Sequence, residues 1–214
     1  MTKVRVMSFS ISLDGYGAGS NQSMEQPLGS GAEELHQWLV ETRTFRSTHG
    51  EEGGDSGIDD EFASRGFSNV GAWIMGRNMF GPVRGSRQDA SWKGWWGDNP
   101  PYHVPVFVLT HERHSPIEMD GGTTFFFVTE GVQSALEQAQ EAAGGRDIRI
   151  GGGVNTIRQF LEAGLIDEMH IAIAPVLLGT GEHLLTGIDL PSLGFERTEH
   201  EATANAMHFV VSKR

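Results

Sequence analysis

The feature that most constrains the fold is an apolar strand that leads directly into three glycines and then into a helix. The segment reads Ile148-Arg149-Ile150-Gly151-Gly152-Gly153-Val154-Asn155. Glycine allows positive φ and a close approach of the backbone to a ligand, and a helix start presents unpaired N–H groups with partial positive charge. Such a junction is typical of α/β sheets and suits a phosphate group. On its own it is equally compatible with a tight strand–helix turn.

Neither of the common nucleotide motifs is complete at this junction. No Gly-Lys-Ser/Thr sequence follows, which excludes a Walker loop, and Thr156 stands where the dinucleotide fingerprint needs its last glycine. The ligand therefore has to be inferred from other segments.

Apolar runs separated by turn signals predict alternating strands and helices along the whole chain. Strands are expected at Val4–Leu13, Val70–Met75, Val104–Leu109, Thr123–Thr129, Asp147–Ile150 and Glu168–Ala174, and helices at Ala32–Thr44, Asp59–Gly66, Val132–Ala143 and Asn155–Ala163. Asp59 is the expected N-cap of its helix. The last two strands, Phe195–Glu201 and Ala206–Ser212, have no helix between them and predict an antiparallel edge. The pattern indicates one α/β domain over residues 1–214, with a mixed, mostly parallel sheet flanked by helices.

Charge and composition limit the partners. The chain has 214 residues with a net charge of −12, and such an acidic surface repels phosphate backbones, so no nucleic-acid partner is expected. It contains no cysteine, which excludes disulfides and thiolate chemistry. No segment approaches the roughly 18 apolar residues of a membrane span, and the N-terminus lacks a signal-peptide pattern. We therefore expect a cytoplasmic protein with no membrane partner.

Two further strand ends carry polar side chains. Gly76-Arg77-Asn78 follows one strand, and Arg77 either pairs with a phosphate or is a solvated arginine in a turn. Thr110 and His111 follow another strand, where they could contact a ribose phosphate. His111 and His114 lack a third ligand and helical spacing, so no metal site is predicted.

Two segments could hold a flat ring. The glycines between Asp14 and Gly19 either let a planar group lie against the backbone or form a flexible connector. The aromatic cluster of Trp92, Trp95 and Trp96 either caps a pocket for the substrate or is a hydrophobic cluster that pins a long loop. Because ligands bind at the carboxyl ends of strands in open α/β sheets, the strand-end segments are expected to build one cleft.

In order and spacing, these segments resemble a known family. They are Ser12-Leu13-Asp14-Gly15, Met75-Gly76-Arg77, Ile150-Gly151-Gly152-Gly153, and the long tail Gly164-Leu165-Ile166-Asp167-Glu168-Met169-His170 … Ala174-Pro175-Val176-Leu177-Leu178-Gly179-Thr180-Gly181. Most of the chain resembles the reductase domain of bacterial bifunctional riboflavin-biosynthesis proteins, the C-terminal part of the deaminase–reductase, which is related to dihydrofolate reductase. The resemblance implies a three-layer dihydrofolate-reductase-like fold and NADPH as the hydride donor to a small-molecule substrate.

The resemblance also implies where the cofactor binds. The implied contacts are Gly151, Gly152, Gly153, Val154 and Asn155 for the pyrophosphate, Gly76, Arg77 and Asn78 for other phosphates, Thr110 and His111 near the adenosine 2′-phosphate, and Ser10 with Gly17 and Ala18 beside the nicotinamide. The family usually has Lys or Thr where this chain has Asn78.

The substrate side is inferred from fewer residues. Dihydrofolate reductases carry a carboxylate early in the first helix that contacts the pterin and helps to supply a proton, and Glu34 falls near that place. Glu33 is adjacent, and both are also compatible with plain helix N-terminal charges. Asp14 and Trp96 are the residues expected to contact the substrate.

Several functions remain open. The first is reduction of a small heterocycle, as in 5-amino-6-(5-phosphoribosylamino)uracil reductase of riboflavin biosynthesis. The alternatives are a dihydrofolate or pterin reductase, a non-catalytic nucleotide-binding paralogue, and a flavin-binding oxidoreductase. A homodimer is expected from the family, with the C-terminal strands as the candidate interface.

Overall fold

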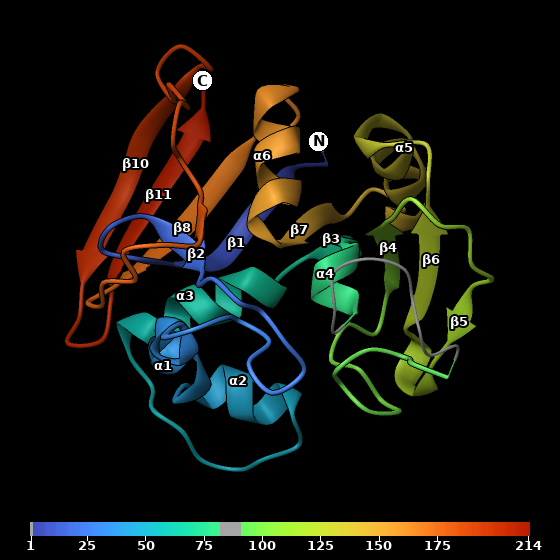
Figure 1. Cartoon of the computed structure of the whole chain (residues 1–214), viewed down its shortest axis with the longest axis horizontal. Helices are drawn as coiled ribbons and strands as arrows, with labels where there is room; N and C mark the ends of the chain where they lie inside the picture. The colour runs from blue at the N-terminus through green and yellow to red at the C-terminus, as the bar shows by residue number, and fades with distance from the viewer. Residues whose placement is uncertain (1, 82–90) are drawn as a thin grey trace.

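The centre of the protein is a nine-stranded sheet in the order β10-β11-β8-β1-β7-β3-β4-β6-β5 (Figure 1). It is seen in a computed structural model, which describes residues 2–81 and 91–214. The parallel strands are β1 (Val4–Ser12), β3 (Val70–Gly76), β4 (Pro105–Leu109), β6 (Thr124–Val128), β7 (Asp147–Gly152) and β8 (Glu168–Ala174). The antiparallel ones are β5 (Ile117–Glu118), β10 (Phe195–Ala202) and β11 (Met207–Lys213). The predicted mixed, mostly parallel sheet with an antiparallel C-terminal edge is confirmed.

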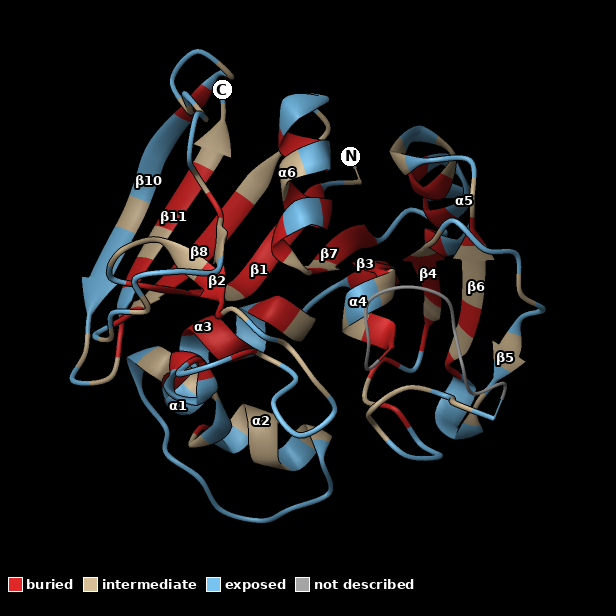
Figure 2. Ribbon diagram, in the orientation of Figure 1, coloured by how far each residue is buried: buried red, intermediate tan, exposed pale blue. Residues whose placement is uncertain are grey.

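Helices cover both faces of this sheet. On one face, α5 (Val132–Ala143) and α6 (Val154–Glu162) bury apolar side chains such as Leu136 and Phe160 in the main core. On the other, α1 (Gln37–Val40) and α3 (Ile58–Phe67) bury Trp38 and Phe62 against β8 and β11. Figure 2 shows the buried strands between these two layers. Within the described residues, no helix has the length and apolar content needed to cross a lipid bilayer.

The helix expected at Ala32–Thr44 is wrong in one respect, because the chain breaks into short pieces. A 3₁₀ turn η1 (Glu33–His36) and α1 precede the break, and α2 (Arg43–Thr48) follows it. Thr42 is extended, with φ −70° and ψ 150°, and its Oγ1 accepts a hydrogen bond from the Phe45 N–H. Thr42 therefore ends one helix and caps the next, and α2 extends beyond Thr44, where the predicted helix ended.

The expected N-cap of α3 is also wrong. Gly57, with φ 152°, occupies the N-cap, and no side chain caps this end. Asp59 lies in the first turn, where its carboxylate accepts hydrogen bonds from His208 and Asn205 on the C-terminal hairpin. The carboxylate thus ties the helix to the sheet edge rather than closing its own first turn.

A second, two-stranded sheet is absent from the sequence expectations. It pairs β2 (Tyr16–Ala18) with β9 (Glu182–His183), and the Tyr16 and His183 rings form a T-shaped pair with centroids 5.1 Å apart. The α4 helix (Arg77–Phe80), which follows β3, is a single turn. These two features bring the chain after β1 and the chain after β3 towards the glycine junction.

Candidate functional site

The carboxyl ends of the parallel strands meet at one edge of the sheet. The segments after β1, β7, β3 and β4 therefore lie at that edge, as the strand order requires. Residues predicted to bind the cofactor lie along this edge: Ser10 near the end of β1, Gly17 and Ala18 after it, and Thr110 and His111 after β4. Open α/β sheets bind ligands at this place, where neighbouring strands lead in opposite directions along the sheet.

The three glycines of the junction differ in how closely other residues pack around them. A Cβ on Gly151 would lie 3.1 Å from the Trp73 ring. Gly152 has φ +131°, and a Cβ there would lie 3.1 Å from the Phe9 ring. Gly153, the N-cap of α6, has φ −75°, and a Cβ there would meet no atom within 4 Å. Packing does not require a glycine at 153, so its missing side chain leaves open space at the start of α6.

Two other predicted contacts are glycines because of close packing at the start of α6. A Cβ on Gly76 would lie 2.4 Å from Thr156 Oγ1, and one on Gly17 would lie 2.7 Å from the Val154 side chain. Val154 and Ala18 are themselves buried. These residues hold the ends of β1 and β3 against α6, and any contact they make with a cofactor remains a prediction.

Ser10 and Asp14 have partners within the protein. Ser10 is buried, and its Oγ accepts a hydrogen bond of 2.9 Å from Trp38 Nε1. The Asp14 carboxylate accepts hydrogen bonds from Ser12 Oγ and from the backbone N–H groups of Leu178 and Gly179. These bonds, that of Ser12 first, lower the pKa of Asp14 to about 2. Asp14 thus joins the end of β1 to the loop after β8, and its contact with substrate stays a prediction.

The remaining phosphate and ribose candidates are more exposed. Arg77 is half-buried beside Gly81, while Asn78, His111 and Asn155 are exposed. Thr110 Oγ1 accepts a hydrogen bond from the Glu112 N–H. No group of three His, Asp or Glu side chains in residues 2–81 and 91–214 is arranged to hold a metal ion.

On the substrate side, Glu34 is exposed in the first turn of η1. Trp96 packs into a hydrophobic cluster, with its ring 5.0 Å from the Tyr102 ring, and Trp92 Nε1 donates a hydrogen bond to the Phe80 carbonyl. This is the arrangement expected if the tryptophans pin a long loop. A contact between Trp96 and the substrate stays a prediction.

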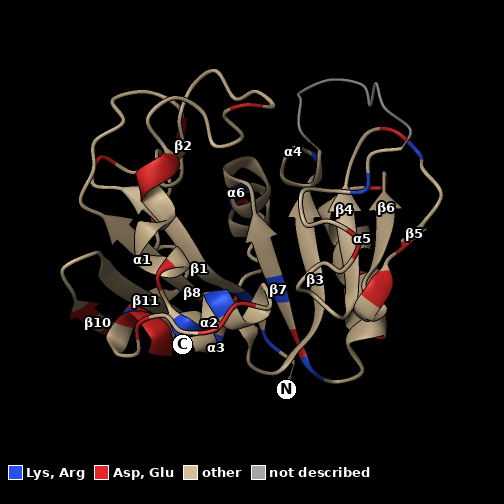
Figure 3. Cartoon of the chain, turned by 90° about the horizontal axis from the view of Figure 1, so that it is seen from below, with Lys and Arg blue, Asp and Glu red and all other residues tan. Residues whose placement is uncertain are grey.

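The sequence expectations miss the buried polar side chains beneath α3. His170 and His208 are fully buried and hydrogen bonded to each other over 3.0 Å. Burial, and then the neighbouring His208, lower the pKa of His170 to about 3. Arg149 is 6% exposed, and burial lowers its pKa to about 9. Figure 3 shows basic and acidic residues on β7, and the sequence of this strand identifies them as Arg149 and Asp147.

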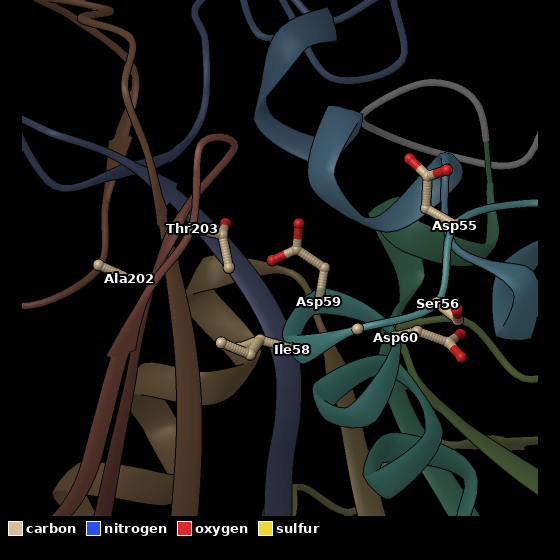
Figure 4. A pocket seen from close by; sticks show the side chains of 8 residues that line it. Asp55, Ser56, Ile58, Asp59, Asp60, Ala202 and Thr203 are labelled. Atoms are coloured by element: carbon tan, nitrogen blue, oxygen red, sulfur yellow. The ribbon is translucent and has the colours of Figure 1, made fainter.

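A pocket of about 310 Å³ lies elsewhere, between the start of α3 and the β10–β11 turn. Figure 4 shows Asp59 and Thr203 on its walls. Its lining includes three aspartates and none of the residues predicted to bind cofactor or substrate. This pocket is therefore separate from the strand-end site. Both oxygens of Asp59 accept hydrogen bonds, from His208 and Asn205.

A family model and two solved structures point to the same family. Residues 3–209 match the model of the RibD C-terminal domain. A structure from Shewanella sp. PV-4, described as a riboflavin biosynthesis protein, is 22% identical and has a TM-score of 0.58, with 100% of this chain and 99% of that chain covered. A diaminohydroxyphosphoribosylaminopyrimidine deaminase/5-amino-6-(5-phosphoribosylamino)uracil reductase from Thermotoga maritima is 12% identical, with a TM-score of 0.55, and 100% of this chain spans 57% of it. No curated protein matches the sequence.

Proposed function

The chain belongs to the RibD C-terminal domain family, and on that premise we propose that it is an NADPH-dependent reductase of a small heterocyclic substrate. The observation that carries the proposal is the open space beside Gly153 at the start of α6. A glycine that packing does not require is explained by a ligand that approaches the main chain closely. The first N–H groups of this nine-residue helix point out of its start, where they suit a pyrophosphate.

The other residues at this edge complete the proposed cofactor site. Arg77 and Asn78 would bind further phosphates at the end of β3, and Thr110 with His111 would lie near the 2′-phosphate at the end of β4. The backbone at Gly17 and Ala18 would flank the nicotinamide. Because the chain carries a net charge of −12, binding of an anionic cofactor depends on these local N–H groups and side chains.

When bound, the nicotinamide supplies the hydride, and the protein has to orient the substrate and provide a proton. Glu34 is the proposed proton donor because it is exposed in the first turn after the segment that leaves β1. The substrate class follows from the family: a flat heterocycle such as the aminouracil named for the Thermotoga maritima relative. A non-catalytic nucleotide-binding protein would bind the cofactor at the same residues and reduce nothing.

Replacement of Gly153 by Val tests the cofactor site. We expect a rise in the Kd for NADPH of at least about tenfold, because the branched side chain fills the space that the pyrophosphate needs. The fold is expected to survive, since a Cβ at Gly153 would meet no atom within 4 Å. Gly152 is a poorer choice, because its φ of +131° would strain any side-chain-bearing residue.

Binding is measured by isothermal titration calorimetry and stability by thermal melting. The matched control is Gln159→Val, which places the same side chain on an exposed position of α6 beyond its first turn. If the folded Gly153→Val protein binds NADPH with wild-type affinity, the start of α6 is not the pyrophosphate site.

Replacement of Glu34 by Gln tests the proton donor. We expect kcat for reduction of the heterocycle to fall by about 10²-fold. This is the lower end of the range for general acid catalysis, because water can partly replace an exposed acid. The Kd for NADPH is expected to stay unchanged. Glu33→Gln is the control, since that neighbouring carboxylate is also exposed in the same turn. Equal effects of the two substitutions would mean that Glu34 acts only as helix-end charge.

A further inference from the structure

The central sheet divides between β1 and β7, beside the proposed cofactor site. β1 pairs with β7 only from Val4 to Val6, whereas it stays paired with β8 as far as Ser12. β7 in turn stays paired with β3 as far as Gly152. Two neighbouring parallel strands therefore separate before they reach the edge of the sheet, which is where α/β sheets of this type bind their ligands.

A bulge in β1 lies at the point of separation. From Val6 to Phe9 there are three steps along β1, which face two steps along β8, so β1 carries one extra residue. Ser8 within this bulge has φ 55°, a conformation that residues with side chains rarely adopt. The bulge takes backbone groups of Met7 and Ser8 out of the ladder, and in a buried strand those groups need other partners.

Two buried side chains supply these partners from the strands on either side. Arg149 of β7 donates from Nη2 to the Met7 carbonyl over 2.9 Å. The Ser8 N–H donates to His170 Nδ1 of β8 over 3.1 Å. One side chain therefore satisfies the carbonyl and the other satisfies the amide of the same bulge.

The position of His170 is fixed in turn by a chain of hydrogen bonds that runs to the surface of α3. Because a backbone N–H can only donate, His170 Nδ1 must accept, and its Nε2–H donates to His208 Nδ1 over 3.0 Å. The Nε2–H of His208 then donates to Asp59 Oδ1 over 2.7 Å. Both imidazoles are neutral in this arrangement and stack on the Phe62 ring. Each ring nitrogen in this series of hydrogen bonds is either a donor or an acceptor, so the tautomers of both histidines are determined.

We propose that His170 and Arg149 are positioning residues that hold β1 apart from β7 and so set the place of the nicotinamide end of the cofactor, an inference that rests on the proposed function. Phe9 follows the bulge directly, and its ring contacts the positions where Gly17 and Gly152 would carry a Cβ. Loss of the bulge would shift the rest of β1 by one residue. Phe9 and Ser10 would then each point to the face of the sheet opposite to the one they occupy now. The predicted nicotinamide contacts would then be misplaced.

A pair of substitutions at His170 separates this role from simple packing. His170→Asn keeps an acceptor oxygen at the place of Nδ1, whereas His170→Gln keeps a polar group only at the place of Nε2. We expect the Kd for NADPH to rise about tenfold in the Gln variant and to stay within about threefold in the Asn variant. Amide hydrogen exchange at Ser8, followed by NMR without cofactor, is expected to accelerate in the Gln variant alone. His200→Gln, on exposed β10, is the control.

Each outcome bears on one claim. Weak binding in the Gln variant with near-normal binding in the Asn variant supports the positioning role. Equal loss in both folded variants means that only packing of the ring matters, and wild-type binding in the Gln variant also overturns the inference. A wild-type protein that binds no NADPH overturns the proposed function instead, and Ser8 exchange then still reports whether His170 holds the bulge.

Discussion

Acidification from pH 7 to pH 5 is expected to lower the free energy of unfolding by about 2 kcal/mol through His170 alone. Burial places the pKa of His170 at about 3 in the folded protein, against 6.5 for an unperturbed histidine. Between these two values the unfolded chain binds one more proton at this site. The stabilisation by neutral His170 is therefore nearly complete above pH 6.5 and is lost as the pH falls. The loss amounts to about 4 kcal/mol near pH 3.

A second histidine acts in the same direction. His36 has its Nδ1 buried, without a hydrogen-bond partner among the described residues, and burial lowers its pKa to about 4. The carboxylates with lowered pKa values, such as Asp14, titrate below this window and do not contribute between pH 5 and pH 6.5.

The measurement is urea unfolding at pH 7, 6 and 5. His170→Asn removes the titrating group. As the pH falls, the free energy of unfolding of this variant is therefore expected to decrease less steeply than that of the wild type, and the difference in slope corresponds to the uptake of about one proton. His200→Gln leaves the slope unchanged because His200 is exposed on β10. Parallel curves for the wild type and His170→Asn would contradict the assignment of the acid sensitivity to His170.

Replacement of Arg149 by Met is expected to cost about 3 kcal/mol of stability. Arg149 donates to the Gly66 carbonyl in the last turn of α3 and to the Met7 carbonyl in the bulge. Methionine fills much of the volume but leaves two buried acceptors without partners, at roughly 1–3 kcal/mol each, and this outweighs the relief of a desolvated charge. The substitution also removes a cation–π contact, in which the guanidinium carbon of Arg149 lies 4.2 Å from the centroid of the Trp73 ring.

Chemical unfolding of the two proteins at pH 7 tests this expectation. Arg113→Met is the matched control, because the Arg113 side chain is 88% exposed and its ion pair with Glu130 is 3.4 Å long. That change is expected to alter stability by less than about 0.5 kcal/mol. A loss below about 1 kcal/mol for Arg149→Met would show that the two carbonyls find water or other partners.

Local sequence signals predict most of the elements that build the site. The apolar run before Gly151 and the helix after Gly153 both form, so the glycine junction is where the residue pattern places it. The helix from Val132 ends at Gly144, whose φ of 59° is the left-handed conformation expected of a terminating glycine. In such segments, short-range spacing and the tertiary fold agree.

The elements that sequence does not predict depend on residues far apart in the chain. His170 and His208 are separated by 38 positions, and each lies in an apolar strand where a single histidine gives no signal. The bulge at Ser8 exists because strands on both sides supply partners, which periodicity along β1 cannot reveal. Thr42 breaks the expected helix through a capping bond that competes with the helical pattern around it.

Helix α3 is anchored to the sheet at both of its ends, by Asp59 at the start and by Arg149 at the finish. The preceding chain from residue 49 to residue 54 is largely exposed and is not needed to hold the helix in place. A protein engineer could therefore lengthen, shorten or exchange this loop without disturbing either anchor. In such a chimaera the two anchors, and with them the position of α3 on the sheet, would be inherited unchanged.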